Sequence, residues 1–115
     1  MNRDDVRGHC LSKPGAFEDF PFGEGVAVIK VSDKMFALIP MAVPVQISLK
    51  CDPDWAAILR QTFPAVQPGY HLNKRHWNTV TLDGSIPDDQ VYEMIDHSYD
   101  LVVKSLPRSV RDSLK

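Results

Sequence analysis

The densest group of chemically capable side chains in the chain lies between Tyr70 and Trp77. These eight residues include two histidines, two cations, one asparagine and two aromatic rings. Lysine and arginine can neutralise phosphates, an asparagine amide can pair with a base edge, and tyrosine or tryptophan can stack on a base. We therefore expect the function of the protein to depend on this segment, with nucleic acid as the first candidate ligand.

Two other interpretations of the same segment stay open. In the first, Tyr70, Leu72 and Trp77 are core anchors, the histidines bond buried backbone groups, and the two cations form a solvated turn. In the second, the segment lines a pocket for a small ligand or a protein partner. A concave pocket that holds His71, His76 and Trp77 would favour this second interpretation, whereas a contiguous basic strip would favour DNA.

Motifs for catalysis and cofactor binding are absent from the sequence. There is no phosphate-binding loop, dinucleotide fingerprint or Gly-x-Ser-x-Gly motif. His71 and His76 have no carboxylate or cysteine companion nearby, which argues against a metal site. The adjacent Asp88 and Asp89 are expected to complement a helix N-terminus. We expect a protein that is not an enzyme and that holds no metal and no cofactor.

The composition is that of one globular domain. The chain has 115 residues, 43% of them hydrophobic, and a net charge of −2 that argues against indiscriminate nucleic-acid binding. Residues 30–77 carry six basic and three acidic side chains, whereas residues 78–107 carry one basic and six acidic ones. This asymmetry predicts a polarised surface if it is not chance, and it makes the acidic helix an alternative contact surface for a protein partner.

Cysteine usage and hydropathy indicate the compartment. Cys10 and Cys51 have no CxxC partner, so we expect two reduced, buried thiols rather than a disulfide. The chain begins with a polar segment and contains no apolar run of the length that a membrane span needs. We expect a cytoplasmic protein with no membrane partner, and a monomer.

The periodicity of the sequence predicts three main helices and four main strands. Asn2 is expected to cap the first helix, and Asp52-Pro53-Asp54 to begin the second, whose apolar stripe is Trp55, Ile58 and Leu59. Residues 16–25 are expected to form a short irregular strand or a covering loop, and residues 64–69 a linker. The helices are expected at 3–12, 53–62 and 87–105, with a last turn at 108–114, and the strands at 26–31, 35–39, 45–51 and 77–82.

The order of these elements predicts the fold class. Val45, Ile47, Leu49 and Cys51 alternate with polar residues, so that strand has a buried face and a wet face, with Lys50 on the wet one. The strands are grouped in a meander rather than alternating with helices. We therefore expect an α+β fold with an antiparallel sheet and helices packed on one face.

Six stretches of the chain, in order, resemble the MmcQ/YjbR family of small bacterial proteins. The most characteristic block is His-Leu-Asn-Lys-x-His-Trp, which runs from His71 to Trp77. The stretches are distributed in order over residues 13–102, so we expect residues 1–115 to form one MmcQ/YjbR-like domain. They are 13–16, 34–38, 48–50, 68–80, 82–88 and 95–102.

This resemblance implies both a fold and a function. It implies a CyaY-like two-layer sandwich, the fold of bacterial frataxin, although frataxin-like iron handling does not follow because the first helix has only Asp4 and Asp5 as acids. It also implies a double-wing DNA-binding role. The residues expected to contact DNA are Lys30, Lys50, Tyr70, His71, Asn73, Lys74, Arg75, His76 and Trp77.

Overall fold

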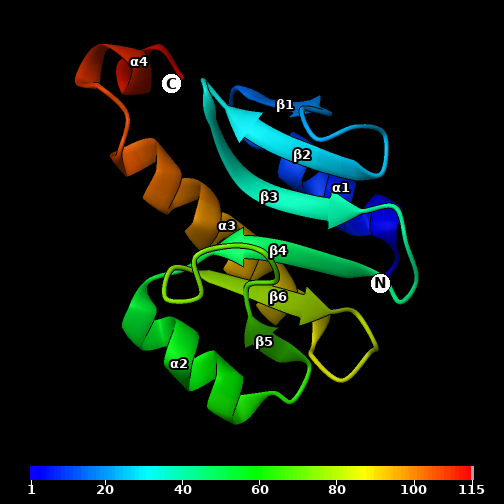
Figure 1. Ribbon diagram of the computed structural model, residues 1–115. Helices are drawn as coiled ribbons and strands as arrows, with labels where there is room; N and C mark the ends of the chain where they lie inside the picture. The colour runs from blue at the N-terminus through cyan, green and yellow to red at the C-terminus, as the bar shows by residue number, and fades with distance from the viewer. Residues whose placement is uncertain (115) are drawn as a thin grey trace.

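The computed structural model of the protein describes residues 1–114 as one antiparallel sheet covered by helices (Figure 1). No helix in this part of the chain is long and apolar enough to cross a membrane. The elements in order are α1 (Arg3–Leu11), β1 (Ala16–Asp19), β2 (Val26–Val31), β3 (Lys34–Pro40), β4 (Gln46–Lys50), α2 (Pro53–Thr62), β5 (Val66–Pro68), β6 (Trp77–Thr81), α3 (Asp88–Lys104) and α4 (Arg108–Ser113).

The sheet has the strand order β1-β2-β3-β4-β6-β5, and every neighbouring pair is antiparallel. This confirms the predicted meander of β2, β3 and β4 and the predicted strand β6. The expectation of a linker over residues 64–69 is wrong, because Val66 pairs with Val80 and starts a sixth strand at the edge of the sheet. β5 has only three residues, one of which is Pro68, so the sequence showed no strand pattern there.

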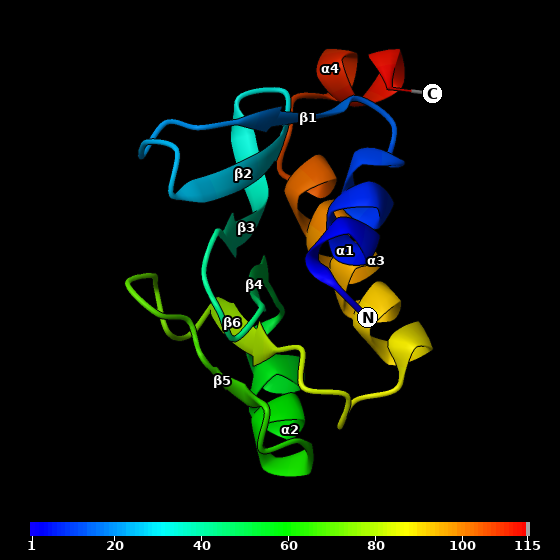
Figure 2. The ribbon, with the colours of Figure 1, turned by 90° about the vertical axis from the view of Figure 1, so that its right-hand side faces the viewer.

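Helices α1 and α3 lie on one face of the sheet, while α2 lies beside β5 at one end of the molecule and α4 lies at the other end (Figure 2). Val6 and Cys10 of α1 and Ile95 and Val102 of α3 each expose at most 1% of their surface to solvent. They pack on the strand residues that point to the same face, and this contact forms the main core. The strand residues of this core are Ala27, Ile29, Val31, Phe36, Ala37, Ile39, Ile47, Leu49, Val66 and Val80.

A serine of α3 joins two strands where their pairing stops. β3 and β4 pair only at Ala37 with Leu49 and at Leu38 with Ser48. Beside these pairs the hydroxyl of Ser98, which is fully buried, donates to the Phe36 carbonyl over 2.6 Å and accepts the Lys50 amide over 2.9 Å. Ser98 therefore satisfies two backbone groups that the ladder leaves unpaired.

The helix starts confirm the predictions made from capping residues. Asn2 and Asp5 form a reciprocal capping box on α1, and the Asp52 carboxylate accepts the first backbone amides of α2. The predicted apolar stripe of α2 is partly wrong, because Ile58 is 56% exposed. α2 contacts the sheet mainly at β5, the short edge strand, so it buries only a narrow face around Ala56 and Leu59.

The face of the sheet away from α1 and α3 is less exposed to solvent than the alternation of apolar and polar residues predicted. Ile47 and Leu49 point to the main core and Lys50 lies half-exposed on the other face, as expected. That other face, however, has a small apolar cluster of its own, made of Val28, Leu38 and Trp77. Polar and apolar residues share this face because two loops cover parts of it, and the sequence period does not report loops.

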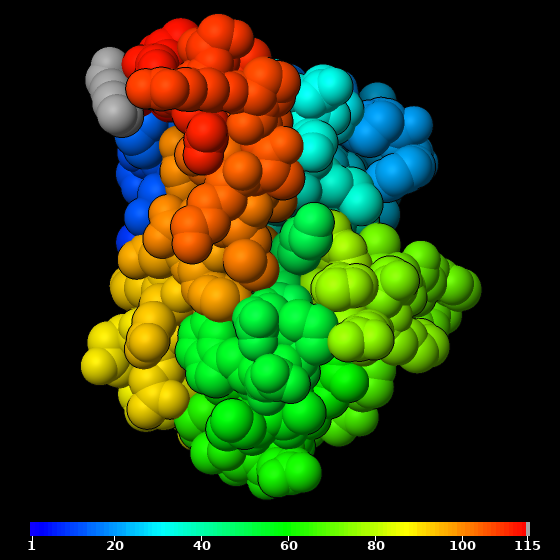
Figure 3. Space-filling view, turned by 90° about the vertical axis from the view of Figure 1, so that its left-hand side faces the viewer, coloured from blue at the N-terminus to red at the C-terminus, as the bar shows by residue number. Residues whose placement is uncertain are grey.

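These two loops project from the sheet on the side away from α1 and α3. They are residues 20–25, between β1 and β2, and residues 69–76, between β5 and β6 (Figure 2). In the space-filling view both project past the helices on the same side of the molecule (Figure 3). The loop 69–76, which contains most of the predicted functional segment, is therefore one of two loops that flank the open face of the sheet.

Both cysteines are buried, unpaired thiols. Burial raises the pKa of Cys10 to about 12 and that of Cys51 to about 11. Neither should react with a thiol reagent in the native protein at mildly alkaline pH, because the reactive thiolate is scarce and enclosed. Two thiols should react after denaturation without reductant. A count near zero in the denatured protein would contradict the reduced state.

Candidate functional site

The loop 69–76 is a compact series of turns rather than an extended strand. The Gly69 amide donates to the Trp77 carbonyl over 2.8 Å, which closes the loop where β5 passes into β6. A side chain at position 69 would bring its Cβ within 2.6 Å of the Trp77 Cβ, so only glycine fits this close approach. The residues from Tyr70 to His76 are thereby lifted out of the sheet.

Arg60 of α2 holds the loop from the helical side. Its guanidinium donates to the Asn78 side-chain oxygen over 2.7 Å, to the Trp77 carbonyl over 3.2 Å, and to the Lys74 carbonyl. Asn78 is almost completely buried, so these bonds lie at the boundary between helix and sheet. A planar guanidinium can serve several acceptors at once, which a lysine cannot do in the same geometry.

Two predicted contact residues bond within the loop. The Asn73 side-chain oxygen accepts the backbone amides of Arg75 and His76, over 3.0 and 3.2 Å. The Lys74 ammonium donates to the Gly69 carbonyl over 3.0 Å. Both side chains therefore stabilise the turn, and the acceptor oxygen of Asn73 is already engaged.

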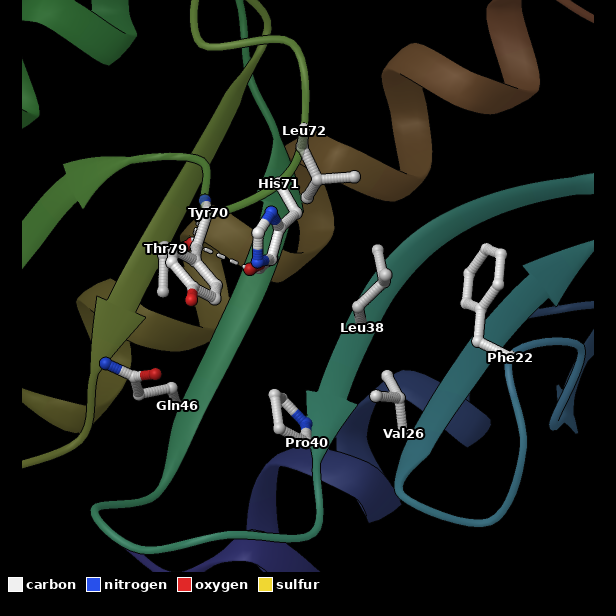
Figure 4. Close-up of a pocket in the computed structure, with 10 residues that line it drawn as sticks. Phe22, Val26, Leu38, Pro40, Gln46, Tyr70, His71, Leu72 and Thr79 are labelled. Atoms are coloured by element: carbon white, nitrogen blue, oxygen red, sulfur yellow. Dashed lines mark hydrogen bonds between the residues drawn. The ribbon is translucent and has the colours of Figure 1, made fainter.

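A hollow lies between the two loops, on the open face of the sheet (Figure 4). Its volume is about 400 Å³. We call it the sheet pocket, and Figure 4 shows Tyr70, His71 and Leu72 on one side of it, Phe22 and Val26 on the other, and Leu38 and Pro40 between them. The lining residues are Phe22, Val26, Leu38, Pro40, Gln46, Ser48, Tyr70, His71, Leu72 and Thr79.

The floor of the sheet pocket carries a pair of hydroxyl groups. The Ser48 and Thr79 oxygens are 2.8 Å apart, and Thr79 also accepts the backbone amide of Tyr70 over 3.0 Å. Both residues are more than nine-tenths buried, and they are direct partners in the register of β4 and β6. The hydroxyl pair thus lies between well-paired strands and also fixes the start of the loop.

Two exposed aromatic rings stand at the rim of the sheet pocket. Tyr70 is 70% exposed and Phe22 is 64% exposed, although both line the pocket. The Tyr70 ring contacts the His71 ring at a centroid distance of 4.0 Å, and His71 has a φ of +59°. A histidine in this left-handed conformation is uncommon, and here it turns the chain so that neighbouring rings lie together.

The structure separates the predicted contact residues into groups. Trp77 is 8% exposed and packs with Val28 and Leu38, so it acts as a core anchor and is not available to stack on a base. Tyr70 is the opposite case, because it is exposed rather than an anchor. His76 is exposed and lies outside the sheet pocket, while His71 lines it.

The predicted cations are not brought into one strip. Lys30 donates to the Asp19 carboxylate over 2.9 Å, and this bond lowers the pKa of Asp19, so the two charges compensate each other. Lys50 lies opposite Trp77 in the register of β4 and β6, beside the loop. Arg75 is exposed and makes no side-chain hydrogen bond or ion pair with residues 1–114. Lys50, Lys74 and Arg75 thus lie in or beside the loop 69–76, whereas Lys30 does not.

The sequence reasoning missed most of the sheet pocket. Phe22, Leu38, Ser48 and Thr79 line it, and none of them was expected in a site. A usable signal was the hydroxyl residues at matching outward positions of two strands, combined with the aromatic and glycine-rich residues 20–25. No group of three or more histidine, cysteine, aspartate or glutamate residues that could hold a metal ion occurs within residues 1–114.

Comparison with known proteins assigns the family. The YjbR family model matches residues 11–101, which include both loops and the whole sheet pocket. The chain belongs to the YjbR family. The match spans β1 to β6 and most of α3, so the described fold is that of the family domain.

Two relatives resemble the chain over most of its length. The chain is 40% identical to the uncharacterized protein YjbR of Escherichia coli strain K12, over 99% of this chain and 98% of that one. It is 27% identical to the uncharacterized protein YyaQ of Bacillus subtilis strain 168, over 88% of this chain and 98% of that one.

Two solved structures share the fold. The crystal structure of Deinococcus radiodurans protein DR2400, described as a DUF419 domain, matches with a TM-score of 0.91 and 42% identity over 96% of this chain and 86% of that one. A crystal structure from Pseudomonas syringae matches with a TM-score of 0.77 and 31% identity over 88% of this chain and 98% of that one. The chain is thus an α+β member of a family of uncharacterised YjbR-like proteins.

Proposed function

We propose that the protein is a binding protein without catalytic activity, and that it holds a small apolar ligand in the sheet pocket. The observation that carries this proposal is the concave hollow of about 400 Å³ between the loops 20–25 and 69–76. Ligand sites of this kind have volumes of roughly 300–1,000 Å³, mostly apolar walls and a few placed polar groups. The sheet pocket has each of these features.

The chemistry of the walls supports an apolar ligand. Five of the lining residues are phenylalanine, valine, leucine or proline, and Tyr70 adds a further ring. Two of these aromatic side chains, Phe22 and Tyr70, are more than three-fifths exposed. Exposed apolar surface gathered around a hollow is typical of a binding site, because covering it removes apolar area from water.

The hydrogen bonds that hold the loop 69–76 favour a binding site that is already formed before the ligand binds. Arg60 donates to the Lys74 carbonyl of the loop 69–76, and the Thr79 hydroxyl accepts the amide of Tyr70 near the start of that loop. A loop fixed at both places loses little conformational entropy when a ligand binds. The floor belongs to paired strands, which adds to this rigidity.

A dye experiment tests this proposal. Prodan, an uncharged naphthyl ketone whose emission shifts to shorter wavelength in apolar surroundings, should bind the full chain at one site. Val26→Trp puts a large ring into the wall of the sheet pocket and should weaken prodan binding by at least about tenfold, or about 1.4 kcal/mol. The titration is followed by fluorescence.

Val43→Trp is the matched control for Val26→Trp. Val43 is 86% exposed in the loop between β3 and β4 and does not line the sheet pocket, so the same change there should leave prodan binding within about twofold of the original protein. Equal weakening by both substitutions, or no saturable prodan binding at all, would overturn the proposed function.

DNA binding is the second candidate, and one observation favours it. Lys50, Lys74 and Arg75 lie around the same loop, and the exposed Arg75 guanidinium has no acidic partner within residues 1–114. A guanidinium in this position is free to contact a phosphate. Because the net charge is −2, such binding would depend on this local group and would be sensitive to salt.

Salt titrations with unrelated DNA duplexes test this second candidate. Each phosphate contact releases about one counterion, so Arg75→Ala should flatten the log–log salt slope by about one unit, and Lys74→Ala with Arg75→Ala by about two. Arg108→Ala, at the far end of the chain on α4, is the control and should leave the slope unchanged. Absence of salt-dependent duplex binding by the unaltered protein at low ionic strength would exclude the DNA role.

The compartment and the assembly state complete this proposal. Two buried, unpaired cysteines support a reducing compartment, and we place the protein in the cytoplasm. The expectation of a monomer stays a prediction, which sedimentation of the full chain measures directly.

A further inference from the structure

The hydroxyl pair on the floor of the sheet pocket has two hydroxyl hydrogens, and only one of them is used in a hydrogen bond within residues 1–114. Ser48 and Thr79 each carry one hydroxyl hydrogen, and their mutual hydrogen bond of 2.8 Å uses one of the two, whichever residue donates. The third group at this place is the Tyr70 amide, and it donates to Thr79 rather than accepting. No acceptor within residues 1–114 takes the second hydroxyl hydrogen, so it is left for water or for a ligand.

The second hydroxyl hydrogen can take part in ligand binding because it lies inside the sheet pocket. Ser48 and Thr79 both line the sheet pocket, and each is more than nine-tenths buried. A ligand that fills the pocket displaces the water that this hydroxyl can otherwise reach. If the ligand offers no acceptor in exchange, a buried donor stays unpaired, which weakens binding.

The charge of the acceptor follows from the other lining residues. The residues that line the sheet pocket include no lysine, arginine, aspartate or glutamate, and His71 stands at the exposed rim. A carboxylate on the floor would be removed from water without a cation to pair with it, which is costly. A neutral carbonyl oxygen accepts the same hydrogen bond without that cost.

We propose that the sheet pocket recognises a flat apolar molecule that presents an uncharged carbonyl oxygen to the Ser48–Thr79 hydroxyl pair. The ring system of the ligand packs between the Phe22 side and the Tyr70–Leu72 side, over Leu38 and Pro40. This inference rests on the proposed function, because it names the ligand class of that same pocket.

The pair of hydroxyls makes the effect of substitutions unusual. In Ser48→Ala the Thr79 hydroxyl loses its neighbour, and its own hydrogen becomes the spare donor. In Thr79→Val the Ser48 hydrogen becomes the spare donor in the same way. Each single variant therefore keeps one donor for the ligand, whereas the double variant with both changes keeps none.

Matched uncharged probes measure this preference on the full chain. Acetylnaphthalene and ethylnaphthalene have nearly the same shape, but only the first has a carbonyl oxygen. In competition with prodan, acetylnaphthalene should bind about tenfold more tightly than ethylnaphthalene. Naphthoate, which replaces the ketone by a carboxylate, should bind more weakly than acetylnaphthalene.

The variants then locate the origin of the preference. Ser48→Ala should keep the acetyl-over-ethyl preference, while Ser48→Ala with Thr79→Val should reduce it to about onefold. Thr79→Val also removes the acceptor of the Tyr70 amide, so saturable prodan binding together with unchanged far-ultraviolet circular dichroism checks that the double variant keeps the pocket. The wild-type comparison stands without the double variant.

The possible failures are distinguishable. Equal affinity of wild-type protein for acetylnaphthalene and ethylnaphthalene would overturn the carbonyl inference while leaving the pocket function intact. Tighter binding of naphthoate would overturn the uncharged class. Failure of every probe, including prodan, to bind would overturn the proposed function together with this inference.

Discussion

Ser98→Ala should lower the free energy of unfolding by about 2–4 kcal/mol, because two backbone groups lose their partner at once. The Ser98 hydroxyl donates to the Phe36 carbonyl and accepts the Lys50 amide, at the point where β3 and β4 cease to pair. The site is fully buried, so water does not replace either bond without opening the contact between helix and sheet. Chemical denaturation measures the change.

Ser113→Ala is the control for Ser98→Ala. Ser113 is exposed on α4, and its hydroxyl donates only to the Val110 carbonyl in the preceding turn of the helix. Its replacement should change the free energy of unfolding by less than about 0.5 kcal/mol. If the two alanine variants proved equally stable, Ser98 would not be the join between α3 and the two strands.

Arg60→Met should lower the free energy of unfolding by about 2–4 kcal/mol and should also abolish prodan binding. The change leaves the Asn78 side-chain oxygen and the Trp77 carbonyl without their charged donor at a buried position. It also removes the bond to the Lys74 carbonyl, by which Arg60 supports the loop that carries Tyr70, His71 and Leu72. Denaturation and prodan fluorescence measure the two effects in the same preparation.

Arg108→Met is the control for Arg60→Met, because it removes an arginine that does not contact the loop 69–76. The Arg108 side chain is 88% exposed, and its contact with Asp112 is 3.9 Å long, so the change should alter stability by less than about 0.5 kcal/mol and leave prodan binding intact. Prodan binding that survives in a folded Arg60→Met protein would show that the loop 69–76 keeps its position without Arg60.

The parts of the fold that follow from local sequence were predicted well. The Asp52-Pro53-Asp54 start of α2 depends on a cap and a fixed proline φ, and both act within one turn of helix. The burial of Ile47 and Leu49 follows from the period of two in a strand with one covered face. Such features need no knowledge of distant residues.

The features that the sequence did not reveal depend on distant contacts. β5 exists because Val66 meets Val80, and the exposure of Ile58 follows from how little of the sheet α2 covers. The role of Ser98 left no signal in the sequence, because its two bonds reach residues 48 and 62 positions away. The spacing of apolar residues shows which face of a helix or strand is buried, but it does not show which residues of other elements pack against that face.

The sheet pocket includes only part of the segment that the sequence singled out. Of the segment 70–77, Tyr70, His71 and Leu72 line the sheet pocket, whereas Asn73, Lys74, Arg75, His76 and Trp77 do not. The shape of the segment depends on Asn73 and Lys74 within it and also on Arg60 and Thr79, which lie outside it. The opposite side of the pocket is lined by Phe22 and Val26. A pocket assembled from separate segments has no spacing that a single sequence can reveal.

An NMR measurement of the bound probe tests the central claim most directly. With acetylnaphthalene bound to the full chain, intermolecular nuclear Overhauser effects should connect the ring protons of the probe to the methyl groups of Val26, Leu38 and Leu72, which line the sheet pocket. Effects to the exposed Ile58 methyls on α2 instead, or no intermolecular effects at a saturating probe concentration, would contradict the account.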